Sequence, residues 1–528
     1  MAKFIASSSN YYSHRLPIYA KNCVATSQPL AAQAGLRILQ QGGNAVDAAI
    51  ATAITLTVVE PTMNGLGSDL FAMIWDGKQL HGINASGKSP QAWSRLHFAK
   101  YKKMPQAGWD TITVPGAISG WVALSREFGC LPFEQLFEQA VQYAENGFLV
   151  SPVVATHWQR SSDPFKNNQE FARVFLPNNR APYAGELFRV LDLAHTLKKI
   201  AESKGQAFYR GEVAEKIAHY ARQENALLTA EDLQQHQSHK VTPLKIKYRG
   251  YHLYELPPNG QGLTVLITLG ILQHFDLDNY PVDSADSLHL QIEAMKIAFS
   301  DAKHYIADPS FMQIDPQELL DSAYLKKRAQ LINKTRAQQP GYGIPHEQGT
   351  VYLTTSDDNG MMVSLIQSHY LIFGSGIVIP GTGILMQNRG ACFTLEPGHP
   401  NEVSGNKYPF HTIIPGFIFK DEKPLMSFGM MGGHMQAQGH VQMIVRLCDY
   451  LQNPQAILDA PRWYISQENK ISIESGIKPE VINELRRRGH FIVPSPTVIY
   501  GGGQAIYCLD EGYLAASDPR KDGQAIGF

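Results

Sequence analysis

The dipeptide Gly349-Thr350 has the residue types that a self-generated nucleophile requires. A threonine hydroxyl is a weak nucleophile at neutral pH and needs a base beside it. Cleavage of the bond before Thr350 would supply that base, because a free α-amine has a pKa of about 7.7–8.0 and is partly neutral. Gly349 would offer an uncrowded carbonyl to the attacking hydroxyl. A Gly-Thr pair at the start of a strand is usually only structural, so the local pattern leaves both interpretations open.

The other common hydrolytic motifs are absent or incomplete in the sequence. No GxSxG motif occurs, so the chain lacks the nucleophile elbow that is typical of the α/β-hydrolases. His346-Glu347 begins like a zinc-protease motif, but position 350 is threonine where the second histidine would stand. His434 and His440 are six residues apart and would not share a helix face. We therefore expect neither a metal ion nor another cofactor.

The residues around Thr350 predict a strand preceded by a loose segment. Residues 333–349 are polar and rich in Pro and Gly, which is typical of an exposed, poorly structured stretch. Val351 and Leu353 then alternate with polar neighbours, as in a half-buried strand. Asp358-Asn359-Gly360 predicts a hairpin turn, with a returning strand from Met362 to Gln367. A sheet would thus hold Thr350 while the segment before it could move away.

The remaining pattern predicts helices packed on sheets. Helix signals dominate the first part of the chain, and strand signals dominate the part after residue 350, which indicates an α/β (α+β) class. The helices are expected at about 30–39, at 44–59 with Asn44 as the cap, through much of 135–240, at Ile292–Ala302 and at Ala437–Leu451. Further strands are expected at Tyr248–Leu256, Thr412–Phe419 and Ala505–Leu509.

Composition narrows the possible partners and locations. The 528 residues are 44% hydrophobic, enough for a large core, and the net charge is −1. No basic field exists to attract a phosphate backbone, so we expect no nucleic-acid partner. The N-terminal residues have no apolar signal-peptide core, and the apolar stretch 44–59 is too short to span a bilayer. Five widely spaced cysteines suggest free thiols, so we predict a cytoplasmic protein without a membrane partner.

Several longer motifs occur in the order typical of the γ-glutamyltransferase family of N-terminal-nucleophile hydrolases, which the chain resembles over nearly its whole length. They are GGNAVDAAIATAITLTVVEP (42–61), NGLGSD (64–69), TVPG (113–116), FYRG (208–211), YRGY with PPNGQG (248–262), FGSGIV (373–378), PGTGILMQN (380–388), MGG (431–433) and SDPR (517–520). The resemblance implies one four-layer αββα unit built by a large chain, 1–349, and a small chain, 350–528, after cleavage between them. It also implies a small amide substrate, with water or an amine as the acyl acceptor.

The resemblance assigns roles to particular residues. Thr350 matches the nucleophile for both self-cleavage and turnover, and Ser368 matches the hydroxyl that hydrogen-bonds it. Gly432 and Gly433 match the glycine pair whose backbone N–H groups stabilise the tetrahedral oxyanion. Thr412 matches one of two hydroxyl residues beside the substrate, and its neighbour here is His411.

The residues that depart from the family pattern stand at positions that bind the substrate in other members. Cys392 stands where glutathione-cleaving members use Asp to bind the α-amino group, and Asn84-Ala85-Ser86 occupies the region of the Arg that binds the α-carboxylate. Arg389 replaces a Gln and Tyr370 replaces an Asn. Loss of both partners of a zwitterion should cost several kcal/mol in binding. The segment Pro397 to Tyr408 is short where many members carry a lid, so we expect an open pocket.

Three functions therefore remain open. The family default is hydrolysis or transfer of γ-glutamyl amides such as glutathione; the main alternative is a non-glutamyl amide acylase, similar to cephalosporin acylases or oxamate amidohydrolase. An unprocessed homologue that only binds is opposed by the intact Thr350, Ser368 and glycine pair. Arg389 predicts an acyl group that carries a carboxylate but no α-amine. In the other interpretation, Arg389 is a structural ion-pair partner that faces away from the pocket.

Overall fold

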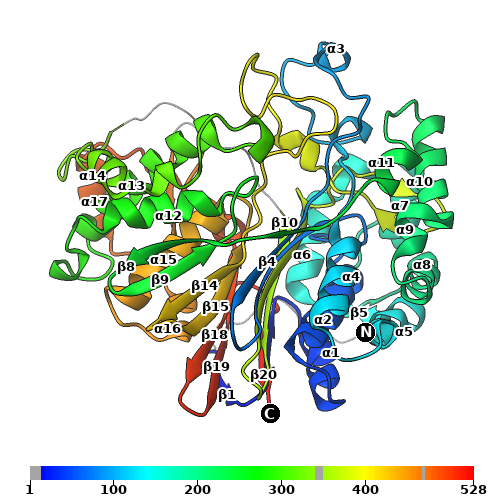
Figure 1. Ribbon diagram of the computed structural model, residues 1–528, viewed down its shortest axis with the longest axis horizontal. Helices are drawn as coiled ribbons and strands as arrows, with labels where there is room; N and C mark the ends of the chain where they lie inside the picture. The colour runs from blue at the N-terminus through cyan, green and yellow to red at the C-terminus, as the bar shows by residue number, and fades with distance from the viewer. Residues whose placement is uncertain (1–13, 339–348, 467–469) are drawn as a thin grey trace.

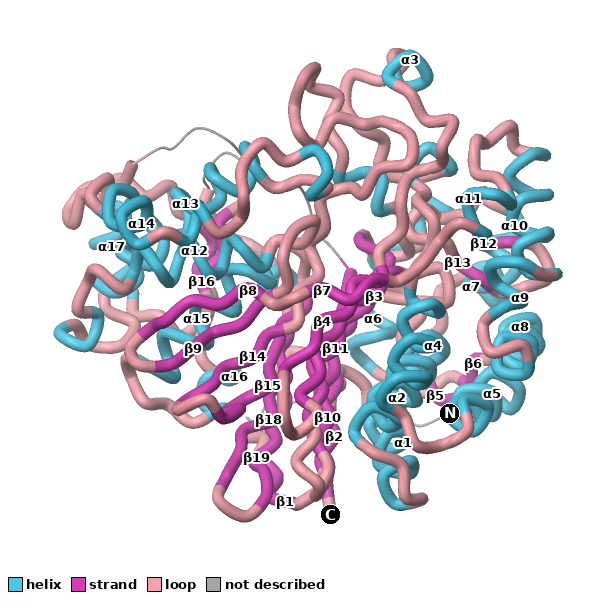
Figure 2. Tube along the Cα trace, viewed as in Figure 1, coloured by secondary structure: helices cyan, strands magenta, loops and turns pink. Residues whose placement is uncertain are grey.

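Two seven-stranded antiparallel sheets lie face to face in the computed structural model, and helices cover the outer face of each sheet (Figure 1). The structure describes residues 14–338, 349–466 and 470–528. Figure 2 shows the two sheets between two groups of helices. One buried core lies between the sheets, and one lies between each sheet and its helices. This arrangement confirms the predicted αββα fold.

Residues before and after position 349 contribute strands to both sheets. The first sheet contains, in spatial order, β1 (Ile18–Ala20), β19 (Gly512–Ser517), β18 (Gly502–Leu509), β15 (Lys423–Met431), β14 (Gly416–Lys420), β9 (Tyr251–Glu255) and β8 (Leu244–Tyr248). The second contains β20 (Gln524–Gly527), β2 (Cys23–Thr26), β10 (Gly349–Ser356), β11 (Met362–Tyr370), β3 (Asp69–Trp75), β4 (Leu80–Ala85) and β7 (His239–Val241). Three short pairs lie outside these sheets: β5 (Phe148–Leu149) with β6 (Leu187–Phe188), β12 (Val378–Ile379) with β13 (Ile384–Leu385), and β16 (Trp463–Ile465) with β17 (Ile471–Ile473).

The helices form two groups, one beside each sheet (Figure 1). The group on the side of the second sheet includes α1 (Pro29–Gln40), α2 (Ala45–Val59), α4 (Ala117–Phe128), α5 (Glu138–Asn146), α6 (Pro152–Ser161), α7 (Gln169–Phe175), α8 (Leu191–Glu202), α9 (Gln206–Arg210), α10 (Glu212–Gln223) and α11 (Ala230–Gln234). The group on the side of the first sheet includes α12 (Gly262–Leu272), α13 (Ala285–Tyr305), α14 (Ser322–Ala329), α15 (Met435–Cys448), α16 (Pro454–Asp459) and α17 (Pro479–Arg487). The short α3 (Arg95–Phe98) projects from the top of the view.

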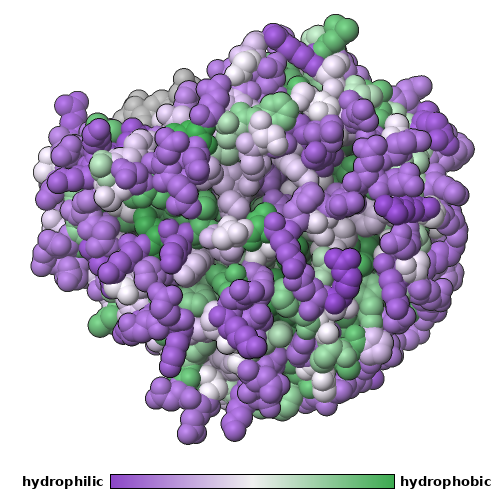
Figure 3. All heavy atoms as spheres, viewed as in Figure 1, coloured by the Kyte–Doolittle hydropathy of each residue, from purple (hydrophilic) through white to green (hydrophobic). Residues whose placement is uncertain are grey.

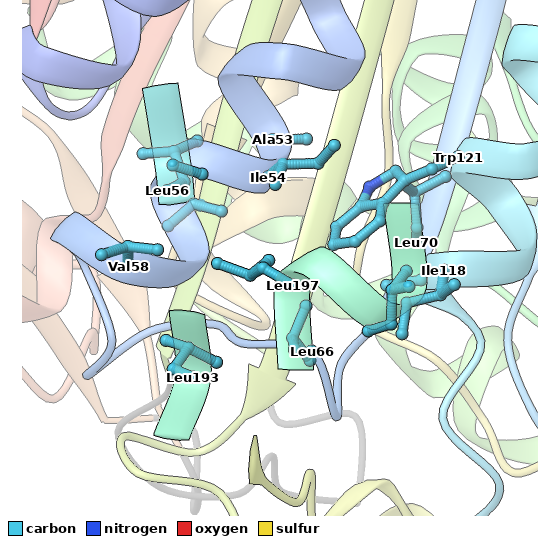
Figure 4. Packing of buried hydrophobic residues seen from close by; sticks show 14 of the residues in the cluster. Ala53, Ile54, Leu56, Val58, Leu66, Leu70, Ile118, Trp121, Leu193 and Leu197 are labelled. Carbon is cyan, nitrogen blue, oxygen red and sulfur yellow. The ribbon is translucent and has the colours of Figure 1, made fainter. Parts of the chain in front are cut away.

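Helix α2 is buried along its whole length between the second sheet and the outer helices. Its cap is Asn44, as predicted: the Asn44 side chain accepts two backbone N–H bonds, and the Asp47 carboxylate accepts the backbone N–H of Asn44. Figure 4 shows Ile54 of α2 packed among neighbours that include Trp121 of α4 and Leu197 of α8. The many alanines of α2 allow this close approach from several sides.

The inner faces of the two sheets hold β10 and β15 against each other. The core between the sheets includes Tyr352 from β10 and Met431 from β15. A hydrogen bond of 2.6 Å joins Thr354 Oγ1 of β10 to Ser427 Oγ of β15. The ring of Tyr352 fits because Gly429 opposite it has no side chain; a Cβ there would lie 2.3 Å from the ring. This contact fixes the strand that begins at Gly349 relative to the end of β15.

Some predicted boundaries differ from the observed ones. The expected hairpin at Asp358-Asn359-Gly360 is confirmed. Tyr248–Leu256, predicted as one strand, instead lies in a β8–β9 hairpin that turns at Arg249 and Gly250, both with positive φ. The strand predicted from Thr412 starts only at Gly416, because the chain at His411 exchanges backbone hydrogen bonds with a loop at residues 259–261.

Hydrophilic residues cover much of the surface seen in Figure 3, and hydrophobic residues show between them. In the part of the chain that the structure describes, no helix is both long enough and apolar enough to cross a bilayer. Of the linker predicted at 333–349, residues 333–338 are described and mostly exposed, as expected. Residues 339–348, with His346-Glu347, and residues 1–13 lie outside the described residues.

The substitution Gly429→Ala should destabilise the protein. The added methyl group would overlap the Tyr352 ring and push the sheets apart, at a cost of about 1–3 kcal/mol for overpacking. Chemical denaturation followed by tryptophan fluorescence measures the loss. A smaller partner should restore part of it, so Gly429→Ala combined with Tyr352→Leu should lose less than the sum of the single variants. Strict additivity, or an unchanged stability in Gly429→Ala, would contradict the packing argument.

Candidate active site

Thr350 lies at the start of β10 with its hydroxyl surrounded by hydrogen-bonding groups. The residue is buried, and its Oγ1 is 3.2 Å from Ser368 Oγ on the neighbouring strand β11. Gln436, in the first turn of α15, donates from Nε2 to the same Thr350 oxygen over 3.3 Å. Ser368 Oγ also accepts the backbone N–H of Tyr370 at 2.8 Å. The Thr350 hydroxyl is therefore held from two elements, a strand and a helix.

A bulge in the β10–β11 pairing produces this arrangement. Gly349 pairs with Tyr370 and Val351 pairs with Gln367, so Thr350 alone stands opposite two residues of β11. Tyr370 closes the bulge with a φ of 82°, a left-handed conformation that is unusual for a bulky side chain. Bulges redirect side chains next to active sites, and here the bulge turns Ser368 toward Thr350.

The predicted oxyanion glycines form a tight turn between β15 and α15. Gly432 and Gly433 have φ values of 114° and 55°, which favour glycine. Neither N–H donates to an acceptor within the described ranges, whereas Gln261 Nε2 donates to the Gly433 carbonyl at 2.8 Å. Gln436, which contacts Thr350, lies three positions after Gly433. Two unused N–H groups at a helix N-terminus can stabilise a developing negative charge.

Arg389 is completely buried beside this site. Its Nη1 donates to Thr412 Oγ1 at 2.9 Å and approaches Cys392 Sγ at 3.7 Å. The guanidinium carbon lies 4.5 Å from the centre of the Tyr370 ring, a cation–π contact. Its Nε and Nη2 have no hydrogen-bond partner among the described residues. Arg389 thus does not form the hydrogen-bonded structural ion pair that the sequence left open, and one edge of its guanidinium remains unused.

Asp69 and His411 form a buried pair behind Arg389. His411 Nε2 lies 3.1 Å from Asp69 Oδ2, and both residues are fully buried. Burial raises the pKa of Asp69 to about 7, against the lowering effect of the nearby Arg389 charge. Burial, together with that same charge, holds the pKa of His411 well below its usual value, so the imidazole is neutral. His411 Nδ1 accepts the N–H of Ile413. Both ring nitrogens of His411 are therefore used inside the fold, and its predicted contact with the substrate stays a prediction.

The segment Asn84-Ala85-Ser86 carries no charge toward the site. Asn84 Nδ2 donates to Asn259 Oδ1 at 2.9 Å, and Asn84 Oδ1 accepts from the backbone and hydroxyl of Ser86. Asn259 Nδ2 donates to the carbonyl of Pro409. These amide and hydroxyl groups satisfy each other, so this region offers no cation to a substrate carboxylate.

A cavity of about 180 Å³ adjoins these residues. Tyr370, Cys392 and His434 line it, and His434 directly follows the glycine pair. Its other walls are largely apolar, with a charged rim, and consist of Phe299, Ala302, Ile306, Ala391, Phe393, Thr394, Asn401 and Phe410, with Lys303, Glu396 and His399 at the edge. The cavity fits a small molecule with an apolar body.

A continuous set of contacts joins most of the predicted residues. Thr350 meets Ser368, Tyr370 covers Arg389, and Arg389 reaches Thr412 and Cys392. Sequence reasoning missed three supporting residues: Gln436 on the Thr350 hydroxyl, Gln261 on the glycine turn, and Asp69 behind Arg389. Of these three, only Gln436 could have been found from the sequence, because it lies within one helical turn of the glycine pair. Gln261 and Asp69 lie within the family motifs PPNGQG and NGLGSD, but each contacts a residue more than a hundred positions away in the sequence.

Comparisons with known proteins agree with this geometry. The family model described as gamma-glutamyltranspeptidase matches residues 31–528. The glutathione hydrolase-like YwrD proenzyme of Bacillus subtilis is 35% identical over 97% of this chain and 99% of its own length. The oxamate amidohydrolase proenzyme of Klebsiella pneumoniae is 33% identical over 94% of this chain and 97% of its own length.

A solved structure extends the comparison to three dimensions. The crystal structure of cephalosporin acylase from Bacillus halodurans is 44% identical and superposes with a TM-score of 0.95, covering 100% of this chain and 99% of that chain. Sequence and fold therefore agree over nearly the whole length. The chain belongs to the gamma-glutamyltranspeptidase family of N-terminal-nucleophile hydrolases.

Proposed function

We propose that the protein is a self-cleaving amidohydrolase in which Thr350 is first the nucleophile of maturation and then that of turnover. The observation that carries this proposal is the Thr350 hydroxyl at the start of β10, held by Ser368 and Gln436 beside a glycine turn with unused N–H groups. The relatives that bear the name proenzyme support it. Five free cysteines support a reducing, cytoplasmic location.

Maturation follows from a hydroxyl placed next to its own peptide bond. Thr350 Oγ1 attacks the Gly349 carbonyl carbon, the C–N bond breaks, and the nitrogen gains the hydroxyl proton, so an ester replaces the amide. Water then attacks the ester, Gly349 leaves as a carboxylate, and the Thr350 hydroxyl regains its proton. The products are a large chain that ends at Gly349 and a small chain that begins at Thr350. Because both chains supply strands to each sheet, they remain one unit.

Turnover uses the amine that maturation releases. The neutral α-amine of Thr350 accepts the hydroxyl proton as Oγ1 attacks the substrate carbonyl. The N–H groups of Gly432 and Gly433 bind the oxyanion, and the leaving amine takes the proton as the C–N bond breaks. Water, or an acceptor amine, then attacks the acyl-Thr350 ester. The products are a free acid or a new amide, with the enzyme restored.

For the substrate, we propose an acyl group that ends in a carboxylate and lacks an α-amine. The unused edge of Arg389 consists of Nε and Nη2, and Arg328 and Arg520 of this chain bind carboxylates bidentately through the same edge. No exposed surface of Arg389 faces the cavity, so the Tyr370 ring must turn aside to admit the carboxylate. Burial raises the pKa of the Cys392 thiol, so Cys392 supplies no negative charge for an ammonium group.

The second candidate is hydrolysis or transfer of γ-glutamyl amides, including glutathione. It is favoured by the glutathione hydrolase-like relative, whose length the chain covers almost completely. The substituted residues around the cavity weigh against it, because Cys392 stands at the position where glutathione-cleaving members use Asp to bind the α-ammonium group. The two candidates differ in one chemical group, the α-amine, and can therefore be separated directly.

Thr350→Ala should remain a single chain, because no hydroxyl can attack the Gly349 carbonyl. The wild type should give two bands on a denaturing gel, and N-terminal sequencing of the smaller fragment should read TVYLT. Thr350→Ser, which keeps a hydroxyl, should still be cleaved. A stable and active wild-type chain without cleavage would contradict the proposed maturation.

Gly433→Ala should strain the positive φ of this position and displace its N–H from the oxyanion. Loss of one oxyanion donor costs about 2.7–4 kcal/mol, so kcat should fall by about 100- to 1000-fold. Initial rates with purified, fully cleaved protein measure the effect. Gly360→Ala is the matched control: Gly360 also has a positive φ, at 86°, but lies in the turn before β11 with open space around it. It should reduce stability without reducing turnover. Wild-type kcat in Gly433→Ala would remove the glycine pair from the mechanism.

Glutaryl-anilide should have a higher kcat/KM than γ-glutamyl-anilide, which differs only by the α-amino group. Arg389→Gln should lower kcat/KM for the glutaryl substrate by about 10- to 100-fold, the value of a hydrogen bond to a charged group. Arg328→Gln, remote from the site and already paired with Asp301, is the control and should keep the wild-type ratio. A strong wild-type preference for γ-glutamyl-anilide would favour the second candidate.

A further inference from the structure

The side-chain amide of Gln261 joins two segments of the candidate site that lie far apart in the sequence. Gln261 is fully buried and directly precedes α12. Its Nε2 donates to the carbonyl of Gly433 at 2.8 Å and also to the carbonyl of Thr412. An amide nitrogen carries two N–H donors, so this single group satisfies both carbonyls. The opposite orientation of the amide would place its oxygen against two carbonyl oxygens.

The oxygen of the same amide shows why a glutamine stands at this position. Gln261 Oε1 is buried and accepts no hydrogen bond from the residues that the structure describes. An unpaired buried acceptor is costly to the fold, and a nonpolar side chain of similar length would avoid that cost. The two N–H donors are what a nonpolar side chain could not supply, and they account for the glutamine.

Each of the two carbonyls belongs to a different part of the site. Gly433 is one of the two glycines whose N–H groups are proposed to bind the oxyanion. Thr412 accepts a hydrogen bond from Arg389 Nη1 through its Oγ1 at 2.9 Å. Three hydrogen bonds therefore lead from the guanidinium of Arg389 through Thr412 and Gln261 to the glycine turn. We call this series of contacts the Gln261 bridge.

The chain around Thr412 has two further anchors. The backbone N–H of Gln261 donates to the His411 carbonyl at 2.9 Å, and Gln436 Oε1 accepts the Ile414 N–H at 3.0 Å. Gln436 also contacts the proposed nucleophile, so a substitution there would change that group directly. The hydrogen bonds of Gln261 end instead on carbonyl groups that take no part in the reaction. Gln261 is therefore the residue through which the bridge can be tested.

We propose that Gln261 is a positioning residue that sets the distance between Arg389 and the glycine turn, and thereby the length of the acyl chain that the enzyme accepts. The inference rests on the proposed function, in which Arg389 binds the carboxylate of the substrate while Thr350 attacks the carbonyl at the other end. A chain that is one methylene too short or too long would misplace that carbonyl by roughly 1 Å, which can cost about 100-fold in rate. A fixed distance between the two groups thus selects one chain length.

A competition experiment measures this selection directly. Succinyl-, glutaryl- and adipyl-anilide have the same leaving group and the same terminal carboxylate, and each differs from the next by one methylene. The three are mixed at equal concentrations, and the rates at which they disappear give the ratios of their kcat/KM values. These ratios do not depend on how much of the protein is cleaved or active. Melting temperatures report the stability of each variant.

Two variants break the bridge and one serves as the matched control. Gln261→Met removes both donors and nearly keeps the length of the side chain. Gln261→Asn keeps an amide but is one methylene shorter, so it cannot reach both carbonyls; it serves if the methionine variant does not fold. Gln442→Met is the control, because Gln442 of α15 is also buried and its Nε2 also donates to two carbonyls, those of Gln438 and Trp463.

Wild type and control should prefer one of the three acyl groups by at least about 10-fold, whereas each folded Gln261 variant should retain a preference of less than about 3-fold. A wild-type preference in the Gln261 variants, or no preference in the wild type, would overturn the inference. Loss of the preference in the control as well would show a general effect of packing and would also overturn it. If the wild type hydrolyses none of the three, the proposed substrate itself fails, and the inference fails with it.

Discussion

The pairing of β10 with β11 decides where the Thr350 hydroxyl stands, and much of the molecule serves to hold that register. One extra residue in β11 brings Ser368 to 3.2 Å from Thr350, while the positive φ of Tyr370 absorbs the distortion. A slip of one residue would turn every side chain of β10 to the opposite face. The fully buried α2 on one side and the Gly429–Tyr352 contact on the other oppose such a slip.

The surroundings of Arg389 and those of Thr350 differ in buried charge. The hydroxyl of Thr350, the proposed nucleophile, contacts a neutral hydroxyl and a neutral amide, whereas Arg389 brings a full charge into the interior without a hydrogen-bonded carboxylate among the described residues. Asp69 offsets part of this charge, and its own pKa near 7 reflects the cost of burial. A buried charge with two unused donors is costly to the fold on its own. In the proposed function, the carboxylate of the substrate completes the pair.

The sequence predicted the parts of the fold that depend on local pattern. Helical spacing and the Asn44 cap predicted α2, and alternation with the Gly360 turn predicted the β10–β11 hairpin. Contacts between distant segments were beyond such patterns. The spacing of residues in the sequence could not indicate that Gln436 would contact Thr350 or that Asp69 would pair with His411. It could not indicate either whether Arg389 had a carboxylate partner. These contacts depend on how separate layers of the fold pack together. The late start of strand β14 has the same cause, since His411 bonds to a distant loop.

Intact-protein mass spectrometry of a rapidly quenched reaction tests most directly whether acyl groups are carried by the Thr350 hydroxyl. With glutaryl-anilide as substrate, the account predicts that the chain 350–528 gains the mass of one glutaryl group. Fragmentation should place that group on Thr350 as an ester, which hydroxylamine removes. An acyl group located on any other residue, or steady turnover with no acylated chain under conditions where deacylation limits the rate, would contradict the account.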